Sequence, residues 1–300
     1  MQIILKWGLV SICILGFVIY FMVSYMVASG VTKSERHPQE NHPSSFDLDF
    51  EDVEFLSRDN DIVLKGWFIK VEQSLGTIIF VHGLGNVRSG DNAVELASRL
   101  SQEGYNSLLF DLRGHGDSGG DRISGGYFEK LDVLGAFDYL IQRNIPEYQI
   151  GLIGFSMGAG IGILAAAEES LINSLVVDTP YAKAEELVAQ ETARKTVFPE
   201  WFVPIFMPGI KFMAQSIYGI DLNALVPEQA VKKLGFPILV IHGQSDTRIP
   251  VNHAERVYNA AHSGSNLWIV PDTEHVDSFI NFPEQYVQKV TNYFETRFID

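Results

Sequence analysis

Three side chains of the types that make a hydrolytic triad follow apolar, strand-like runs in this chain of 300 residues. Ser156 ends IGLIGF within Gly-Phe-Ser-Met-Gly, Asp246 follows PILVIHGQS, and His275 follows LWIVPDTE. A serine hydroxyl is a weak nucleophile at neutral pH unless an imidazole takes its proton and a carboxylate orients that imidazole. The residues therefore predict covalent catalysis with Ser156 as nucleophile, His275 as base and Asp246 as acid.

A second Gly-x-Ser-x-Gly match surrounds Ser118, so the local context must separate the two copies. Ser156 stands between an apolar strand and the helix-like run MGAGIGILAAA, which is the strand-turn-helix arrangement of a nucleophile elbow. Ser118 lies in RGHGDSGGDRISGG, which holds too much glycine to begin a helix. Its GDSGG resembles the nucleophile loop of chymotrypsin-like proteases, but those are all-β proteins. We predict a turn serine there.

Other acids and histidines compete for the roles of base and acid. Asp178 also ends a predicted strand and is the alternative acid. His82 and His242 end buried strands, where an imidazole more often holds a loop by hydrogen bonding. His253 and His262 fall within a predicted surface helix, so we expect them to be solvated.

The oxyanion hole requires two backbone N–H groups aimed at the reacting carbonyl oxygen. One is expected from Met157, the residue after the nucleophile. The other is expected from Leu84, in the loop VHGLGN that follows the first predicted parallel strand. Losing such a donor commonly raises the barrier by about 3 kcal/mol.

The rest of the chain predicts a mostly parallel sheet flanked by helices. Residues 52–58 and 62–71 predict an opening antiparallel pair, and short apolar runs then alternate with longer helical patterns. Such alternation is typical of βαβ units. The further strands are expected at 77–81, 107–111, 150–155, 175–178, 237–242 and 267–270, and the helices at 91–103, 128–143, 157–169, 251–262 and 283–297.

Residues 181–230 interrupt this alternation and predict a helical cap. An insertion after the carboxyl end of a strand lies where open α/β sheets bind ligands. Trp201 and Phe206 are our candidates for an acyl pocket within it. The segment is rich in large apolar side chains, which include Phe198, Phe202, Met207, Phe212, Met213 and Tyr218.

An uncharged run of 23 residues, from Trp7 to Ser29, predicts a single membrane-spanning helix. As a helix it is roughly 35 Å long, whereas a signal peptide has an apolar region of only about 7 to 15 residues. We expect an uncleaved anchor over residues 1–30, with a cleaved signal as the alternative. Residues 31–49 are expected to form a polar tether and residues 50–300 the folded domain.

The net charge and the cysteine content limit which partners the protein can bind and indicate in which compartment the domain lies. The formal charge of −15 repels nucleic acid phosphates, and the sequence offers no basic surface of the kind that binds DNA or RNA. Cys13 is the single cysteine, and no cluster of residues has metal-ligand spacing, so we expect neither a metal nor another cofactor. The chain after Gly30 has no cysteine and carries net charge −16, which favours an extracytoplasmic domain on a cell membrane.

Five segments together resemble the α/β-hydrolase superfamily over about residues 50–297, most of all the branch of monoacylglycerol lipases and serine aminopeptidases. They are TIIFVHGLGN, GYNSLLFDLRGHGDSGG, GLIGFSMGAG, PILVIHGQSDTRIP and PDTEHVDSF. The chain order serine, aspartate, histidine is that of the same superfamily. The resemblance implies a serine hydrolase that works through an acyl-enzyme. Serine at position 156 argues against epoxide hydrolases and haloalkane dehalogenases, which have aspartate there.

The expected function is hydrolysis of small carboxylic esters with an apolar acyl chain by a membrane-anchored serine hydrolase. Amide or peptide hydrolysis at the same triad is the first alternative. A catalytically silent hydrolase fold that serves as a binding protein is the second. The sequence leaves the oligomeric state open.

Overall fold

Residues 2–298 are described in a computed structural model, and they form two compact units. Residues 34–183 and 226–298 make up one unit, which we call the hydrolase unit. Residues up to Lys33 and residues 184–225 make up the other, which we call the anchor-cap unit.

An eight-stranded sheet in the order β1-β2-β4-β3-β5-β6-β7-β8 is the centre of the hydrolase unit. β2 runs antiparallel to both of its neighbours, and all other neighbouring pairs are parallel, so the predicted mostly parallel sheet is confirmed. The strands are β1 (Phe50–Leu56), β2 (Val63–Ile69), β3 (Gly76–Val81), β4 (Tyr105–Phe110), β5 (Ile150–Phe155), β6 (Leu175–Asp178), β7 (Leu239–Gly243) and β8 (Asn266–Val270).

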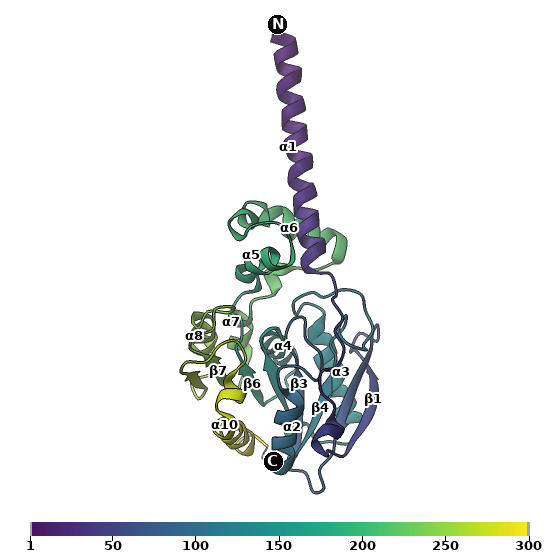
Figure 1. The fold of residues 1–300 in the computed structure, drawn as a ribbon, viewed down its shortest axis with the longest axis vertical. Helices are drawn as coiled ribbons and strands as arrows, with labels where there is room; N and C mark the ends of the chain where they lie inside the picture. Colours follow the sequence, from purple (N-terminus) through teal and green to yellow (C-terminus); the bar gives the residue numbers. More distant parts are fainter. Residues whose placement is uncertain (1, 299–300) are drawn as a thin grey trace. The chain divides into compact units, whose positions relative to one another are not determined.

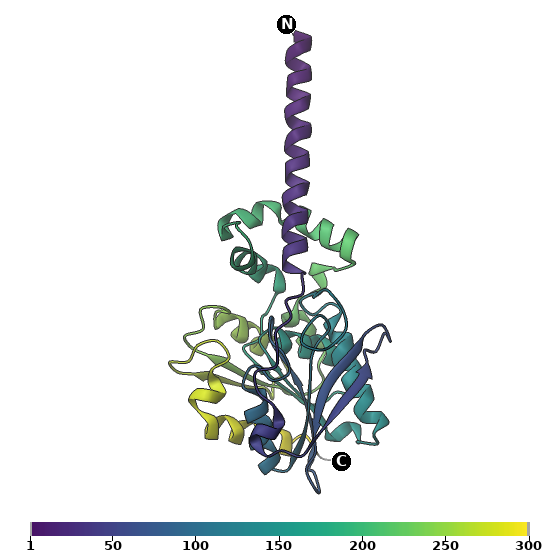
Figure 2. The same ribbon diagram turned by 45° about the vertical axis from the view of Figure 1, so that its right-hand side comes forward.

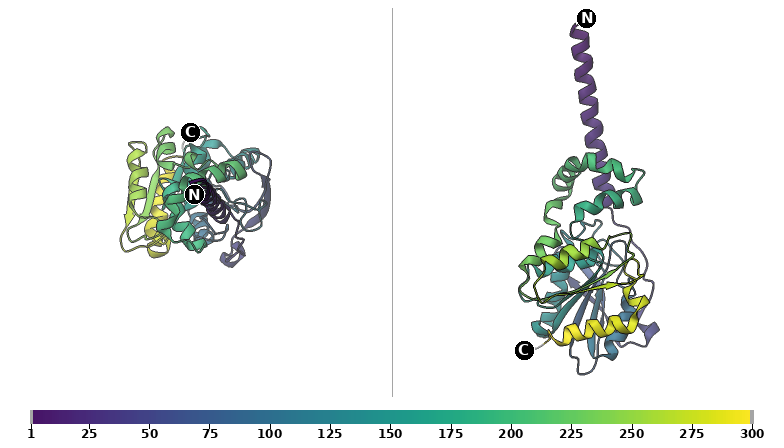
Figure 3. Two further views of the ribbon diagram at one scale, coloured as in Figure 1. Left: turned by 90° about the horizontal axis from the view of Figure 1, so that it is seen from above. Right: turned by 90° about the vertical axis from the view of Figure 1, so that its left-hand side faces the viewer.

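Helices cover both faces of this sheet (Figures 1 and 3). α2 packs with α10 over one face, and α3 packs with α4 over the other. The helices of the unit are α2 (Ala93–Gln102), α3 (Glu129–Gln142), α4 (Met157–Ala166), α7 (Pro227–Ala230), α8 (Asn252–Ala260), α9 (Ser278–Asn281) and α10 (Pro283–Glu295), with 3₁₀ turns at Pro43–Phe46, Glu147–Gln149 and Val231–Lys233.

The continuous apolar runs of the sequence are the strands buried on both faces. Every residue of β3, β5, β6 and β7 is buried, whereas β1 alternates between buried and exposed residues towards its end. A strand covered by helices on both sides must be apolar throughout, while an edge strand keeps one wet face. This is why β3, β5 and β6 form the rigid support of the site.

The strand register brings three carboxyl ends to one edge of the sheet. Phe155 of β5 pairs with Asp178 of β6, which pairs with Ile241 of β7. Gly243, the last residue of β7, pairs with Val270, the last residue of β8. The loops that carry the three triad candidates therefore begin at the same edge.

The anchor-cap unit is wholly helical. It contains α1 (Gln2–Val31), α5 (Ala184–Lys195) and α6 (Val203–Tyr218), with 3₁₀ turns at Glu200–Phe202 and Leu222–Ala224. The C-terminal part of α1 contacts α6 and, to a smaller extent, α5, so that cap helices flank it (Figure 2). Residues Ile4–Val31 make up the one helix, within the described part of the chain, that is long and apolar enough to cross a membrane.

The segment expected to be a polar tether makes specific contacts from Ser34 onward. Arg36 donates hydrogen bonds to the carbonyl oxygens of His115, Gly116 and Gly120, at 3.2, 2.6 and 2.6 Å. The Gln39 amide donates to both carboxylate oxygens of Asp111. The segment expected to be a polar tether is therefore a strap bound to the hydrolase unit from Ser34 onward, and the carbonyl oxygen of His115 accepts from the N–H of Ser118 as well as from Arg36.

Candidate active site

Ser156 occupies the tight turn between β5 and α4 that the sequence predicts. Its backbone has φ 53° and ψ −115°, a left-handed conformation that is costly for a residue with a Cβ. The Ser156 N–H donates to the carbonyl oxygen of Asp178 at 2.9 Å, which ties the turn to the neighbouring strand. The strain holds the hydroxyl at the carboxyl edge of the sheet.

The two glycines of the motif are required by close packing. A Cβ on Gly158 would lie 2.0 Å from the carbonyl oxygen of Val81, and one on Gly154 would lie 2.4 Å from the carbonyl oxygen of Gly158. Distances this short force the backbone apart. Only glycine lets α4 pack so closely against β3 and β5.

His275 bridges the serine and the aspartate. Its Nε2 lies 2.9 Å from Ser156 Oγ, and its Nδ1 lies 2.8 Å from Asp246 Oδ2. Because the carboxylate accepts, Nδ1 carries the proton and Nε2 is free to accept from the hydroxyl. The structure thus brings together the three residues that the sequence singles out, in the order required of nucleophile, base and acid.

Asp246 is held in its ionised form. Burial raises its pKa, but the hydrogen bond and charge of His275 and the N–H of Ile249 outweigh burial, so the pKa lies below its usual value. Its Oδ1 accepts from the N–H groups of Arg248 and Ile249, both at 2.8 Å. A buried carboxylate with these donors can stabilise a protonated His275 imidazole.

Met157 and Leu84 lie on the elements expected to supply the oxyanion hole. Met157 is the first residue of α4, and the first N–H groups of a helix have no acceptor within the helix. Leu84 follows Gly83, where an added Cβ would lie 3.3 Å from Ser156 Cβ, so this loop passes directly beside the nucleophile. Their role as oxyanion donors stays a prediction.

Asp91 is a part of this site that the sequence analysis missed. Its Oδ2 accepts from the N–H of Gly83 at 2.8 Å, and it thereby fixes the loop that carries Leu84. Burial raises the pKa of Asp91 above its usual value, with His275 and Arg248 opposing that rise. Asp91 and Asn92 both have positive φ, but no local pattern in the sequence connects them to a loop eight residues earlier.

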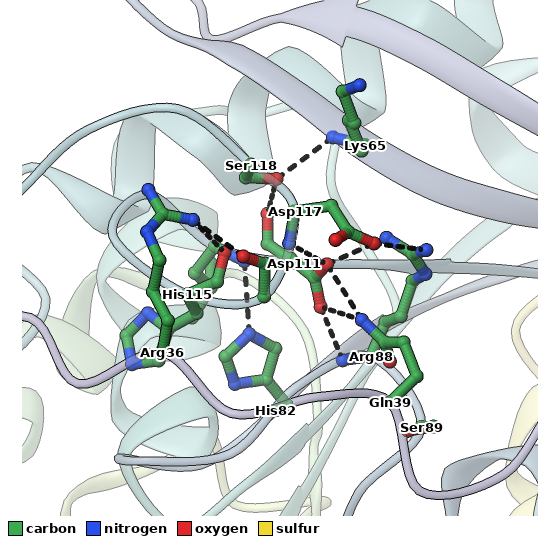
Figure 4. A network of polar contacts seen from close by, with 12 residues as sticks. Arg36, Gln39, Lys65, His82, Arg88, Ser89, Asp111, His115, Asp117 and Ser118 are labelled. Atoms are coloured by element: carbon green, nitrogen blue, oxygen red, sulfur yellow. Dashed lines mark hydrogen bonds and ion pairs between the residues drawn. The ribbon is translucent and has the colours of Figure 1, made fainter.

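The hydroxyl of Ser118 is joined by hydrogen bonds to the backbone of Lys65 and Asp111, and no dashed line in Figure 4 joins it to His82 or His115. Its Oγ donates to the carbonyl oxygen of Asp111 at 2.6 Å and accepts from the N–H of Lys65 at 2.9 Å. Asp111 in turn pairs with Arg88 at 2.7 Å. The serine therefore supports a turn, as the glycine-rich context predicts.

The alternative acid, Asp178, makes no hydrogen bond to His275. It accepts from Tyr286 OH at 3.0 Å and from Thr179 Oγ1 at 3.1 Å. Complete burial raises the pKa of Asp178 to about 7. A buried carboxyl group that resists ionisation orients an imidazolium poorly.

Two of the remaining histidines stabilise loops as expected. His82 Nε2 accepts from the N–H of Leu112 at 3.0 Å, and burial together with the nearby His115 lowers the pKa of His82 to about 3. His242 Nε2 lies 2.8 Å from the carbonyl oxygen of Ile249. The expectation for His253 was wrong: it is buried, and its Nδ1 accepts from the N–H of Ala182.

The acyl-pocket candidates have different surroundings within the anchor-cap unit. Phe206 is 7% exposed and stacks on Tyr20 of α1, with ring centroids 5.2 Å apart. Trp201 is 73% exposed. A role for either residue in binding an acyl chain stays a prediction.

No group of three or more histidine, cysteine, aspartate or glutamate side chains is arranged to hold a metal ion among the described residues.

The sheet order, the strained serine turn and the position of the cap insertion define the class: this chain has the α/β-hydrolase fold. The family model described as alpha/beta hydrolase fold matches residues 76–207. The chain is 28% identical to the uncharacterized protein YqkD of Bacillus subtilis over 77% of its length and 75% of that protein.

Two relatives with named activities are also similar. Lysophosphatidylserine lipase ABHD12 of Xenopus tropicalis is 28% identical to this chain. The match covers 67% of this chain and 51% of the lipase. Among solved structures, the Pyrococcus furiosus esterase Pf2001 is 28% identical, with a TM-score of 0.72 over 90% of this chain and 99% of the esterase. These similarities support an esterase- or lipase-like hydrolase.

Proposed function

We propose that this protein is a serine hydrolase that cleaves carboxylic esters through an acyl-enzyme intermediate on Ser156. The observation that carries the proposal is the continuous hydrogen-bonded series from Ser156 Oγ through His275 to Asp246, at 2.9 and 2.8 Å. The esterase and lipase relatives support the same reaction class.

The reaction follows from this geometry. His275 Nε2 accepts the hydroxyl proton as Ser156 Oγ attacks the ester carbonyl carbon. The oxyanion forms beside the N–H groups of Met157 and Leu84, which stabilise the developing charge. The imidazolium then gives its proton to the leaving alcohol, and the acyl group stays on Ser156. A water molecule, deprotonated by the same imidazole, releases the carboxylic acid.

Labelling with a fluorophosphonate probe tests the nucleophile. The full-length protein in detergent should be labelled at Ser156, as located by peptide mass spectrometry, and should hydrolyse p-nitrophenyl esters of short and medium acyl chains. Ser118→Ala is the matched control, because it removes the other Gly-x-Ser-x-Gly serine and should leave labelling intact. Labelling at Ser118, or none at all, would overturn the proposal.

We infer that α1 anchors the enzyme in a membrane, with the hydrolase unit on the extracytoplasmic side. α1 spans 30 residues, and large apolar side chains from Ile4 to Met26 are exposed along it. Detergent should release the full-length protein from membranes, whereas alkaline carbonate and high salt should not. Added protease should reach the hydrolase unit in intact cells, and complete protection would reverse the orientation.

A further inference from the structure

The helix α6 is apolar on the face that it buries and on the opposite face. Val203, Phe206 and Ile210 are buried with the C-terminal part of α1. On the outer side, Trp201 of the preceding 3₁₀ turn and then Ile205, Pro208 and Phe212 of α6 are exposed. They follow one another at helical spacing of four, three and four residues. A surface helix in water has a polar outer face. Most of the outer face of α6 is therefore apolar, and Gln215 and Ser216 are its exposed polar residues, near the C-terminal end. A largely apolar outer face favours contact with a second apolar partner.

The only charged residue of α6 is paired away from this outer face. Lys211 Nζ lies 2.8 Å from Glu185 Oε2 of α5 and 3.0 Å from Asn223 Oδ1. The exposed stripe formed by Trp201, Ile205, Pro208 and Phe212, which we call the outer stripe, therefore carries no charge. Nothing polar in it opposes contact with hydrocarbon.

Exposed apolar residues are distributed differently in the two units. Val197, Trp201, Ile205, Phe212 and Ile217 are 92, 73, 59, 57 and 50% exposed within a span of 21 residues. Scattered single residues of this kind are normal on any protein surface, but a contiguous patch marks an interaction site. In the hydrolase unit such residues occur singly or in pairs: Leu75, Ile141 and Leu171 stand alone, Leu56 pairs with Val63 across β1 and β2, and Ile280 lies two residues from Phe282.

The contacts between α1 and α6 determine at which depth in a bilayer α6 would lie if α1 crosses it. Phe206 stacks on Tyr20, and the Gly209 N–H donates to Tyr20 OH at 3.0 Å. Gly209 is also in close contact with Ser24, because a Cβ at Gly209 would lie 2.2 Å from Ser24 Oγ. A hydrocarbon core about 30 Å thick takes roughly 20 helical residues. Counted from Ile4 such a core ends near Ser24, and counted from Trp7, where the uncharged run begins, it ends near Met26. In either case α6 meets α1 close to the boundary of that core.

We propose that α6 lies in the interfacial layer of the bilayer beside α1 and contacts lipid through the outer stripe; this rests on the proposed membrane anchor. Its 16 residues span roughly 24 Å, too short to cross a hydrocarbon core, so the helix lies along the surface. Residues 184–225 carry three basic and five acidic residues, so burial of apolar side chains drives the contact and zwitterionic lipid suffices.

The native cysteine makes the test direct, because Cys13 is the single cysteine of the chain and is exposed on α1. The full-length protein is labelled there with an environment-sensitive fluorophore and reconstituted in phosphatidylcholine vesicles. In a Cys13→Ser background, Ile205→Cys and Phe212→Cys carry the same label on the outer stripe. Ile280→Cys is the matched control, since Ile280 is 55% exposed in the hydrolase unit. Hydrolysis of a soluble ester shows that each variant is folded.

Labels at positions 205 and 212 should emit at shorter wavelength than the label at 280 and lose intensity when doxyl-labelled lipid is added. Emission at 205 and 212 like that at 280 would overturn the proposal. A blue shift without quenching by doxyl lipid would also overturn it, because a second copy of the chain would then cover the stripe. An aqueous label at Cys13 would instead refute the anchor itself, which distinguishes the two failures.

Discussion

The hydrolase unit and the anchor-cap unit use apolar residues in opposite ways. In the hydrolase unit, β3, β5 and β6 are buried completely between two helical layers, and apolar residues on the surface are scattered. In the anchor-cap unit, α1 and α6 bury one side against each other and expose an equally apolar side. The comparison supports the proposal that one unit lies in water and the other in an apolar environment. Chemistry and location should therefore be separable by mutation.

Removing the nucleophile should have the largest effect and should be confined to the hydrolase unit. Ser156→Ala removes the attacking oxygen, so ester hydrolysis should fall by several orders of magnitude, up to about 10⁶-fold. Membrane retention should not change. Initial rates with p-nitrophenyl esters and carbonate extraction measure the two properties. Full activity in Ser156→Ala would contradict the site.

Changing the acid should have the next largest effect. Asp246→Asn keeps the shape of the side chain but favours the wrong tautomer of His275, which costs roughly 10⁴-fold in a comparable triad. The rate constant of hydrolysis measures it, and unchanged thermal unfolding would show that the fold is intact. A loss below tenfold would remove Asp246 from the triad.

A substitution in the seam between α1 and α6 should show the reverse pattern. In Gly209→Leu the side chain would collide with Ser24 and Tyr20, and such overpacking costs about 1–3 kcal/mol. Limited proteolysis should cut α6 faster, while hydrolysis of a soluble ester stays within a few fold. Gly8→Leu is the control, because nothing lies within 4 Å of a Cβ at Gly8. If protease cut α6 equally fast in both variants, the contact between α1 and α6 would not be what holds the anchor-cap unit together.

The smallest effect is expected from Asp178. Its pKa of about 7 in the fold lies above the usual value, so its contribution to stability is present at low pH and is lost as the pH rises through 7. Asp178→Asn lacks this titration, so its melting temperature relative to the parent should rise between about pH 4 and pH 7 and stay constant above pH 7. Its activity should stay within a few fold. Collapse of activity would instead make Asp178 the acid.

The sequence predicts that the three triad candidates lie together because strand ends are local features. Ser156, Asp246 and His275 each follow an apolar strand, and parallel strands end at one edge of a sheet, so their proximity follows from element order alone. Their hydrogen-bond distances required the structure. Asp91 was missed because its hydrogen bond to the N–H of Gly83 forms only when the loop between the two residues is folded, and no local sequence pattern specifies that fold.

The cap illustrates the opposite case. An aromatic cluster around Phe206 has the same composition whether it lines a ligand pocket or packs on another helix. Its contact with Tyr20 joins residues 186 positions apart in the chain, and nothing local specifies that pairing. His253 shows the same limit. Its helix has a polar sequence, but the imidazole is buried in the fold and accepts a hydrogen bond from the backbone N–H of Ala182.

The backbone of Ser156 places function and stability in direct opposition at one residue. With φ at 53° and ψ at −115°, a side chain at this position costs of order 1–3 kcal/mol, which glycine would avoid. Ser156→Gly should consequently unfold at a higher temperature than the parent protein while having no nucleophile. Selection for thermal robustness alone would replace this serine by glycine, so a strained serine here is what the proposed reaction requires.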